Sequence, residues 1–338
     1  MGYLAYEVLA TYAEHIGYVN EKYKQLAYRI TTVKQFKPGR VFEFGDFRIM
    51  PITLDHSAFD AYAFKIEAKG LKVFHTGDFR THGFRSSKFW KVINYFIGKI
   101  DYIVCEGTNI SRSNSEPKTE YNLQKEFRKV FQVNKYNIIY LSSTNIDRIF
   151  GIYQAALCVE LPFYVDSYQK RIMDIVIRRK HIWSKSSLYK YHYDKKPKVL
   201  KTDYRSNEFY IDDNIALEKG YVLIARANEK FDNLIMNLPG DNKHIYLSMW
   251  KGYADKTRTA YNPALAKSLK SNYQLMHTTG HCDMKSIEKL IEVLLPNAII
   301  PIHTDQPKAF AERFSTQCPV ILLNDGESIN LIRNSIVK

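Results

Sequence analysis

The stretch FRIMPITLDHSAFDAYAFKIEAKGLKVFHTGDFR, residues 47–80, carries the pattern that decides the fold. Its short apolar runs are separated by turn residues, which predicts successive β-strands. Polar residues follow two of these runs: Asp55 and His56 follow the first, and Gly77 and Asp78 follow the last. A carboxylate and an imidazole at strand ends are suited to binding a metal ion, and glycine permits a close approach of the backbone.

Two histidines far downstream also follow apolar runs, His281 in TTGHCD and His303 in PIHTD. The set His56, Asp78 and His303 offers the ligand types that Zn²⁺ or Mn²⁺ prefers. Each residue also has an ordinary explanation, because a Gly-Asp pair is common in turns and helix caps. A histidine after a strand is often only hydrogen-bonded.

Two other histidines, His75 and His82, flank Asp78. We interpret them as packing and surface residues rather than ligands.

Elsewhere the apolar spacing predicts an α/β fold. Helices are expected at residues 3–18, 116–131, 147–157, 261–270 and 285–294, and strands at residues 102–105, 136–141, 221–225, 244–248, 298–302 and 320–323. In the middle third, strands alternate with helices, which indicates a parallel sheet.

The charge of the chain indicates a polyanionic partner. With 338 residues, the chain is long enough for about two domains. Its formal net charge of +14 favours nucleic acid, although a uniformly solvated basic surface is the alternative. The basic and aromatic stretch Arg178–Lys201 suits backbone neutralisation with base stacking, and a solvated face is nearly as good an interpretation.

The cysteines and the absence of targeting signals in the sequence indicate a cellular compartment. The 4 cysteines are scattered, which favours a reducing compartment. Neither a membrane-spanning run nor a signal peptide is visible in the sequence, so we expect a cytoplasmic protein and no membrane partner.

Six segments occur together in one order: LDHSAFDAYAF, HTGDFR, CEGTN, LSSTNIDR, TTGHCD and PIHT. This order resembles that of the β-CASP metallo-β-lactamase nucleases, and the segments are most similar to those of the ribonuclease J branch. The resemblance extends from about Phe47 to Asp305.

The resemblance implies a role for each strand-end residue. His56, Asp78 and His303 correspond to metal ligands, with Asp78 as the bridging aspartate. Glu106 and His281 correspond to catalytic residues, and His281 oriented by Glu106 is suited to proton donation. The implied cofactor is a pair of Zn²⁺ ions, with Mn²⁺ as an alternative, and the implied reaction is hydrolysis of RNA phosphodiester bonds.

The resemblance also implies an architecture. It is a metallo-β-lactamase αββα sandwich, here N-terminally truncated, with an inserted β-CASP α/β cap domain. We expect the first part of the sandwich at residues 1–109, the β-CASP domain at 110–261 and the return segment of the sandwich at 262–338.

The loop between the strand at residues 136–141 and the next helix is predicted to bind a substrate phosphate. Its hydroxyls, helix amides and guanidinium come from Ser142, Ser143, Asn145 and Arg148. The alternative is a plain helix cap by Asn145.

One feature of the family is missing from these residues, the His-x-His-x-Asp-His cluster that supplies the other ligands. We therefore expect Met1 to be an internal methionine of a longer protein, and the chain as given to be weak or inactive as a nuclease. The alternatives are a catalytically dead RNA-binding or scaffold homologue, and a DNA-directed β-CASP nuclease. A homodimer, or pairing with an active homologue, is a further expectation from the family.

Overall fold

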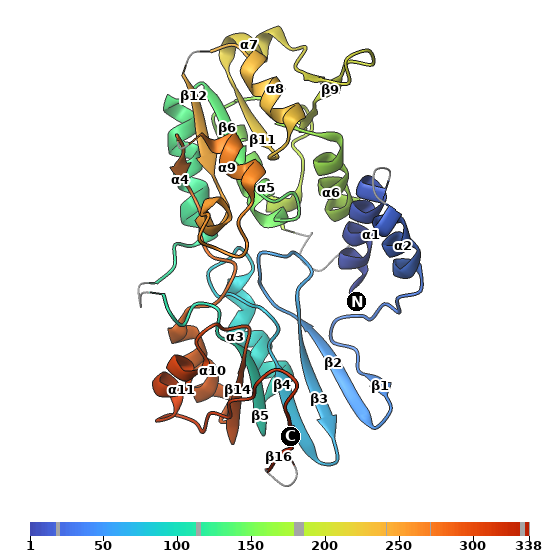
Figure 1. Ribbon diagram of the computed structural model, residues 1–338, viewed down its shortest axis with the longest axis vertical. Helices are drawn as coiled ribbons and strands as arrows, with labels where there is room; N and C mark the ends of the chain where they lie inside the picture. The colour runs from blue at the N-terminus through green and yellow to red at the C-terminus, as the bar shows by residue number, and fades with distance from the viewer. Residues whose placement is uncertain are drawn as a thin grey trace. The chain divides into compact units, whose positions relative to one another are not determined.

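The computed structural model describes residues 1–17, 21–112, 116–178, 186–240, 242–270, 272–331 and 335–337. The chain forms two compact units (Figure 1). The first unit consists of Met1–Ala5, Lys34–Pro117 and Gly280–Lys338, and the second of Tyr6–Val33 and Lys118–Thr279. The predicted α/β class is confirmed by the helices and the parallel and mixed sheets. The division differs from the expected one, because residues 6–33 belong with the second unit and its last boundary lies at 279 rather than 261.

The first unit is built on a six-stranded sheet in the order β1-β2-β3-β4-β5-β14. Its strands are β1 (Phe42–Phe44), β2 (Phe47–Thr53), β3 (Tyr62–Ala68), β4 (Leu71–His75), β5 (Tyr102–Glu106) and β14 (Ala298–Ile302). The first four strands pair antiparallel, whereas β4, β5 and β14 pair parallel. The turn between β3 and β4 has positive φ at Lys69 and Gly70, 50° and 81°, as a tight hairpin requires.

One face of this sheet carries the core of the first unit. Alternate strand residues such as Phe74 and Ile103 are fully buried there, against apolar side chains of the helices. The helical segments of this unit are η1 (Ser86–Lys88), α3 (Phe89–Val92), the π-helical turn η2 (Ile93–Ile97), α10 (Met284–Leu294) and α11 (Pro307–Phe314).

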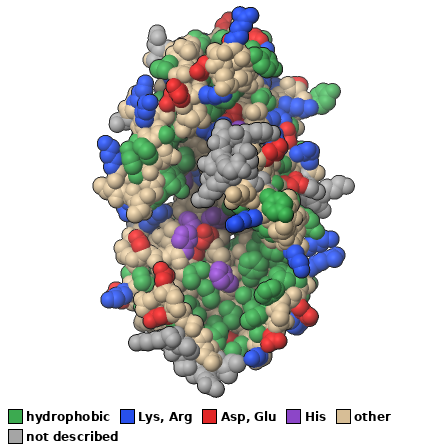
Figure 2. All heavy atoms as spheres, turned by 45° about the vertical axis from the view of Figure 1, so that its right-hand side comes forward, with side chains coloured by type: hydrophobic (Ala, Val, Ile, Leu, Met, Phe, Trp, Pro, Cys, Tyr) green, Lys and Arg blue, Asp and Glu red, His purple; other side chains and the backbone are tan. Residues whose placement is uncertain are grey.

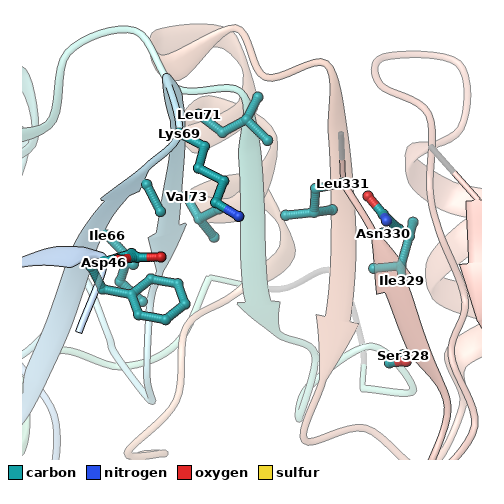
Figure 3. Close-up of a pocket in the computed structure, with 11 residues that line it drawn as sticks. Asp46, Ile66, Lys69, Leu71, Val73, Ser328, Ile329, Asn330 and Leu331 are labelled. Atoms are coloured by element: carbon teal, nitrogen blue, oxygen red, sulfur yellow. The ribbon is translucent and has the colours of Figure 1, made fainter. Parts of the chain in front are cut away.

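The other face of the sheet is only half-buried. An antiparallel pair of strands, β15 (Ser328–Asn330) and β16 (Ser335–Val337), follows β14 in the chain. Between the sheet and β15 lies a cavity of about 520 Å³, lined by apolar side chains including Ile66, Val73 and Ile329 (Figure 3).

The second unit contains the parallel sheet that the alternation of strands and helices predicts. Its order is β13-β12-β6-β11-β7-β8, and every pairing in it is parallel. The strands are β6 (Tyr136–Tyr140), β7 (Phe163–Val165), β8 (Lys198–Val199), β11 (Tyr221–Ala225), β12 (Lys243–Leu247) and β13 (Gln274–Leu275), with a separate pair of β9 (Lys201–Thr202) and β10 (Phe209–Tyr210).

The helical segments of this part of the chain include one near each of the predicted ranges 3–18, 116–131, 147–157 and 261–270. They are α1 (Tyr3–Gly17), α2 (Glu21–Thr31), α4 (Glu120–Val133), α5 (Ile146–Cys158), α6 (Ser167–Arg178), η4 (Ser187–Tyr189), α7 (Asn214–Lys219), α8 (Glu229–Asn237), η5 (Lys251–Ala254) and α9 (Pro263–Leu269). Among the described residues, none of the helices of either unit is long and apolar enough to cross a membrane.

One predicted strand is wrong. Residues 320–323 make only an isolated bridge, in which Val320 pairs with Ile299. Two hydrogen bonds with Ile299 hold this segment beside β14, and the chain then leaves the sheet. The basic stretch Arg178–Lys201 falls partly outside the described residues, because 179–185 are not among them.

Candidate metal centre

Four strands of the first unit end at the same edge of the sheet. Because β2 and β4 are both antiparallel to β3, they run in the same direction, and β5 and β14 are parallel to β4. The carboxyl ends of these strands lead into His56, Asp78, Glu106 and His303. The parallel alignment therefore gathers side chains that are up to 247 positions apart in the sequence, from 56 to 303.

A group of four side chains at this edge could hold a metal ion. One ligand atom each from Asp78, Glu106, His281 and His303 lies within 4.8 Å of the others. The shortest contact in it joins His303 Nδ1 to Asp78 Oδ1 at 2.8 Å. Histidine and acidic side chains also gather in one patch of the molecular surface (Figure 2).

His56 lies beside this group. Its Nε2 is 4.0 Å from Asp78 Oδ2, and its ring centroid is 5.2 Å from that of His281. The Nδ1 atom accepts a hydrogen bond of 3.1 Å from the Ala58 amide, so in the neutral ring the proton resides on Nε2. In this tautomer Nε2 carries the proton and lies 3.4 Å from Ser57 Oγ. Metal binding through Nε2 would require the ring to release the Ala58 amide.

Glu106 and His281 form a hydrogen-bonded pair. Glu106 is fully buried, and its Oε2 lies 2.9 Å from His281 Nδ1 while its Oε1 accepts the Phe79 amide at 2.7 Å. The carboxylate thus fixes one nitrogen of the imidazole and leaves Nε2 on the far side of the ring. The centroids of His281 and His303 are 5.2 Å apart.

Two residues that the sequence analysis left without a role hold the His281 segment in place. They follow Glu106 in the motif CEGTN. Asn109 Nδ2 donates to the carbonyl oxygens of His281 and Cys282, at 3.1 and 2.8 Å. The Thr108 hydroxyl lies 3.3 Å from His281 Nδ1 and donates to the His303 carbonyl at 3.2 Å.

The backbone adopts unusual conformations at this edge. His303 has φ of 51°, in the left-handed region that residues with a side chain seldom adopt. Gly77 has φ of 55°, and a Cβ atom there would lie 2.6 Å from the Tyr62 carbonyl oxygen. Glycine is therefore required at position 77 by its backbone conformation and by the close approach of the loop to β3.

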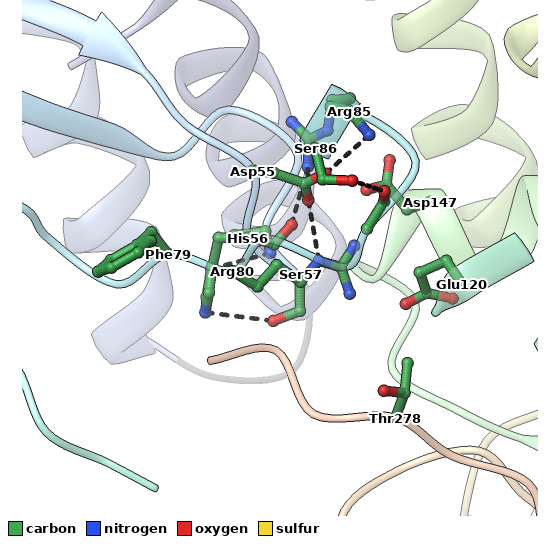
Figure 4. Close-up of polar contacts among 12 residues, drawn as sticks. Asp55, His56, Ser57, Phe79, Arg80, Arg85, Ser86, Glu120, Asp147 and Thr278 are labelled. Atoms are coloured by element: carbon green, nitrogen blue, oxygen red, sulfur yellow. Dashed lines mark hydrogen bonds and ion pairs between the residues drawn. The ribbon is translucent and has the colours of Figure 1, made fainter. Parts of the chain in front are cut away.

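A buried ion-pair network supports His56 (Figure 4). The Asp55 carboxylate accepts from Arg80 Nε at 2.8 Å and from the Arg85 amide at 2.7 Å. The Arg85 guanidinium in turn donates to the carbonyl oxygens of His56, at 2.8 Å, and of Phe59. The side chains of Asp55 and Arg80 are 1% and 0% exposed, so their charges neutralise each other away from water. The sequence analysis assigned these arginines no role.

His75 and His82 are not part of the group. His75 Nδ1 accepts the Gly77 amide at 3.1 Å, which agrees with a packing role. His82 is 5% exposed, so it is a buried residue rather than a surface one.

The predicted phosphate-binding loop lies in the second unit. Ser142 is exposed, and its hydroxyl is 2.9 Å from that of Thr144, whereas Ser143 is buried. Asn145 caps α5, because its side chain accepts the Arg148 amide at 3.3 Å. This is the structural role given as the alternative for Asn145, and it leaves phosphate binding by the loop as a prediction.

The Arg148 guanidinium is 2% exposed and holds the fold of the second unit together. It forms two bonds of 2.7 Å with the two carboxylate oxygens of Glu120. Its remaining N–H groups face Ser248, at 2.8 and 3.3 Å, the Thr278 carbonyl at 3.2 Å and His277 Nδ1 at 3.5 Å. With all five donors used inside the protein, this side chain has none left for a phosphate.

Comparisons with known proteins give a fold and no function. No protein-family model matches the chain, and no curated protein matches it. A crystal structure of a protein of unknown function from Enterococcus faecalis V583 is similar, with a TM-score of 0.62 over 90% of this chain and 67% of that chain. The identity is 17%, so the likeness supports the α/β fold alone.

We predict that the neutral form of His56 persists in acid. Burial is the main cause that lowers the pKa of His56 to about 3; His281 lowers it further, Asp78 opposes the shift, and Arg80 and Arg85 add to it. The unfolded chain protonates a histidine near pH 6.5, at about its ordinary pKa. The neutral, buried ring of His56 therefore makes its full contribution to the free energy of unfolding above about pH 6.5. This contribution declines as the pH falls from 6.5 toward 3, because only the unfolded chain takes up the proton.

Proton NMR of the chelator-treated protein measures this directly. The His56 ring resonance should stay unshifted through pH 5, and in concentrated urea it should titrate near its ordinary pKa of about 6.5. A midpoint near this value in the folded protein would contradict the burial of the ring.

We also predict that Asp55→Ala destabilises the protein by about 3–5 kcal/mol, because it removes the carboxylate shared by two buried arginines. Glu67→Ala is the matched control, since its ion pair with Arg48 has side chains that are 60% and 31% exposed. The control should cost less than about 1 kcal/mol. Urea unfolding measures both, and equal midpoints for the two variants would rule out a supporting role for the Asp55 network.

Proposed function

We propose that this chain is a metal-dependent hydrolase of nucleic-acid phosphodiester bonds, related to the ribonuclease J branch of the β-CASP metallo-β-lactamase nucleases. The observation that carries the proposal is the convergence of Asp78, Glu106, His281 and His303 within 4.8 Å at one edge of the sheet. The order of the six sequence motifs supports it independently. The first unit would then be the metallo-β-lactamase part and the second the β-CASP cap.

The donor set fits a divalent ion. Ligand atoms at roughly 2.0–2.2 Å from a zinc ion are at most about 4.4 Å apart, so the observed limit of 4.8 Å requires only small side-chain movements. A carboxylate with imidazoles is also suited to Mn²⁺. Asp78 and His303 would hold the ion, and His56 would join them after releasing the Ala58 amide. Three ligands are closer to what one ion needs than to what two ions need. We therefore expect a second ion to bind weakly and the activity to be low.

The residues of the chain have distinct tasks in the proposed reaction. Glu106 orients His281 through Nδ1, so that His281 Nε2 can deliver a proton to the leaving oxygen of the scissile phosphodiester. A bound divalent ion supplies a water of lowered pKa and stabilises negative charge on the phosphoryl oxygens. Asp78 would offer a carboxylate oxygen to the ion, and the buried Asp55 network would keep the His56 loop in position.

We propose RNA as the substrate, on the basis of the net charge of +14 and the ribonuclease J-like motifs. The net charge of +14 favours the binding of any polyanion and does not distinguish RNA from DNA. The choice of RNA therefore rests on the motifs. A chain that binds RNA without cleaving it would be the catalytically dead scaffold homologue.

Cleavage of end-labelled single-stranded RNA and of DNA of the same sequence tests the function. With Zn²⁺ or Mn²⁺ we expect slow cleavage of RNA that chelator abolishes. Asp78→Asn and His281→Ala should each reduce the rate by about 100-fold or more, because they remove a ligand and a proton donor. His244→Ala is the matched control, an exposed histidine on β12 of the second unit, and should cleave at the wild-type rate.

Three outcomes would overturn the proposal in different ways. Cleavage that Asp78→Asn and His281→Ala leave unchanged would come from a contaminant. Preferred cleavage of DNA would overturn the substrate assignment. Tight RNA binding with no cleavage at any metal concentration would favour the scaffold homologue.

A further inference from the structure

The cavity of about 520 Å³ on the half-buried face of the first unit's sheet lies apart from the metal centre (Figure 3). The turn between β3 and β4 borders the cavity, whereas Asp78 follows the opposite end of β4. Cavities of roughly 300–1,000 Å³ with mostly apolar walls and a few polar groups are the usual sites of small-molecule binding. The residues around this cavity therefore decide what kind of molecule it accepts.

The walls of the cavity are apolar and come from distant parts of the chain. Ile66 of β3 and Val73 of β4 are paired in the sheet and form one wall. Ile329 of β15 and Leu331, which follows β15, form the other. The Tyr102 hydroxyl of β5 donates to the Leu331 carbonyl at 3.2 Å, which ties the second wall to the sheet. The cavity is therefore enclosed between two parts of the fold and is not simply an open sheet face.

Two side chains of opposite charge line the same rim of the cavity. Arg48 pairs with Glu67 in the β2–β3 ladder. Asp46 lies in the turn two residues before Arg48. Lys69 lies in the turn two residues after Glu67, so the two turns are neighbours at one end of the ladder. In Figure 3 the Lys69 side chain extends from its turn toward the middle of the cavity.

Both charges are available to a ligand. Asp46 and Lys69 are exposed, and neither side chain forms a hydrogen bond or an ion pair with any residue that the structure describes. A Cβ atom placed on Gly45 or Gly70, the glycines next to them, would meet no atom within 4 Å beyond its chain neighbours, so the rim is open. A carboxylate beside an ammonium complements a zwitterion, whereas a simple carboxylic acid would face Asp46 and a simple amine would face Lys69.

We propose that this cavity binds a free apolar α-amino acid, such as leucine. Its α-carboxylate pairs with Lys69, its α-ammonium pairs with Asp46, and its side chain packs between the two apolar walls. Burial of the apolar side chain supplies most of the affinity, because ion pairs at an exposed rim contribute little. The site is distinct from the metal centre and does not depend on the proposed reaction.

Titration of the full chain with leucine in the presence of chelator tests the proposal. The chelator is needed because an amino acid also coordinates metal ions. Binding is followed by NMR of the methyl groups of Ile66, Val73 and Ile329, with a methyl group of the buried Ile138 in the second unit as the reference. We expect leucine to shift the first three signals and to leave the Ile138 signal unchanged.

Three analogues in separate titrations identify the groups of the ligand that the site recognises. 4-Methylpentanoate lacks the ammonium group of leucine, 3-methylbutylamine lacks its carboxylate, and glycine lacks its side chain. Loss of either charge should weaken binding by about fivefold, the upper range for an exposed ion pair. Loss of the side chain should weaken binding by about tenfold or more, because its burial is lost.

Variants of the rim and the wall complete the test. Lys69→Asn should weaken leucine binding by about fivefold, and asparagine tolerates the φ of 50° at this position. Ala68→Phe should weaken it by about tenfold or more, because the added ring fills part of the cavity. Lys72→Gln is the matched control and should stay within about twofold of wild type. Lys72 is exposed on β4 between Leu71 and Val73, and successive side chains of a strand point to opposite faces.

Three results would overturn the proposal. The first is the absence of leucine-dependent shifts at Ile66, Val73 and Ile329, which needs only the wild-type chain. The second is equal affinity for leucine and 4-methylpentanoate, which would exclude recognition of a zwitterion. The third is wild-type affinity in a folded Ala68→Phe variant, which would place the ligand elsewhere. All three are measured without metal and without nucleic acid, so failure here is distinguishable from failure of the proposed function.

Discussion

The candidate metal centre depends on one constraint, the common direction of β2, β4, β5 and β14. Because these strands run the same way, the residues that follow them meet at one edge of the sheet. His281 lies in the loop before α10 and is held at this edge by its contacts with Glu106 and Asn109. The register of these strands must be exact, because a slip of one residue would turn Glu106 to the other face of the sheet. His303 has an unfavourable φ of 51°, and the backbone at Gly77 approaches β3 closely. Such conformations persist only where the surrounding structure holds them, and here the paired strands of the sheet do so.

The two units use the same principle with different chemistry. In the first, the carboxyl edge collects carboxylates and imidazoles, which are metal-ligand types. In the second, the exposed hydroxyls of Ser142 and Thr144 follow β6, and Arg226 follows β11. The first edge is supported by the buried ion pair of Asp55 with Arg80, whereas in the second unit the buried Asp166 pairs with Arg226, whose side chain is 28% exposed. Charged residues that look alike in the sequence thus divide into supports and candidate ligand-binding groups.

Much of this arrangement could be predicted from the sequence. What could not be predicted has a physical reason. Apolar runs located the strands and the polar residues Asp78, His281 and His303 that follow such runs, whereas Glu106 was chosen only from the family resemblance. The structure brings these four side chains together. Burial of a charge cannot be read from spacing, because it depends on partners far away in the sequence. For that reason the Asp55 network was missed, and the burial of Arg148 against Glu120 was not predicted. The prediction of a strand at 320–323 was wrong. An apolar run does not show whether the segment pairs with a neighbouring strand over its whole length, and here only Val320 pairs with Ile299 of β14.

The measurement that tests the central claim most directly is the position of a bound ion in crystals of the chain soaked with Zn²⁺, located by anomalous diffraction. We predict a peak at roughly 2.0–2.2 Å from an Asp78 carboxylate oxygen and an imidazole nitrogen of His303. Zinc peaks found only at other positions, such as the exposed thiol of Cys158, would contradict it.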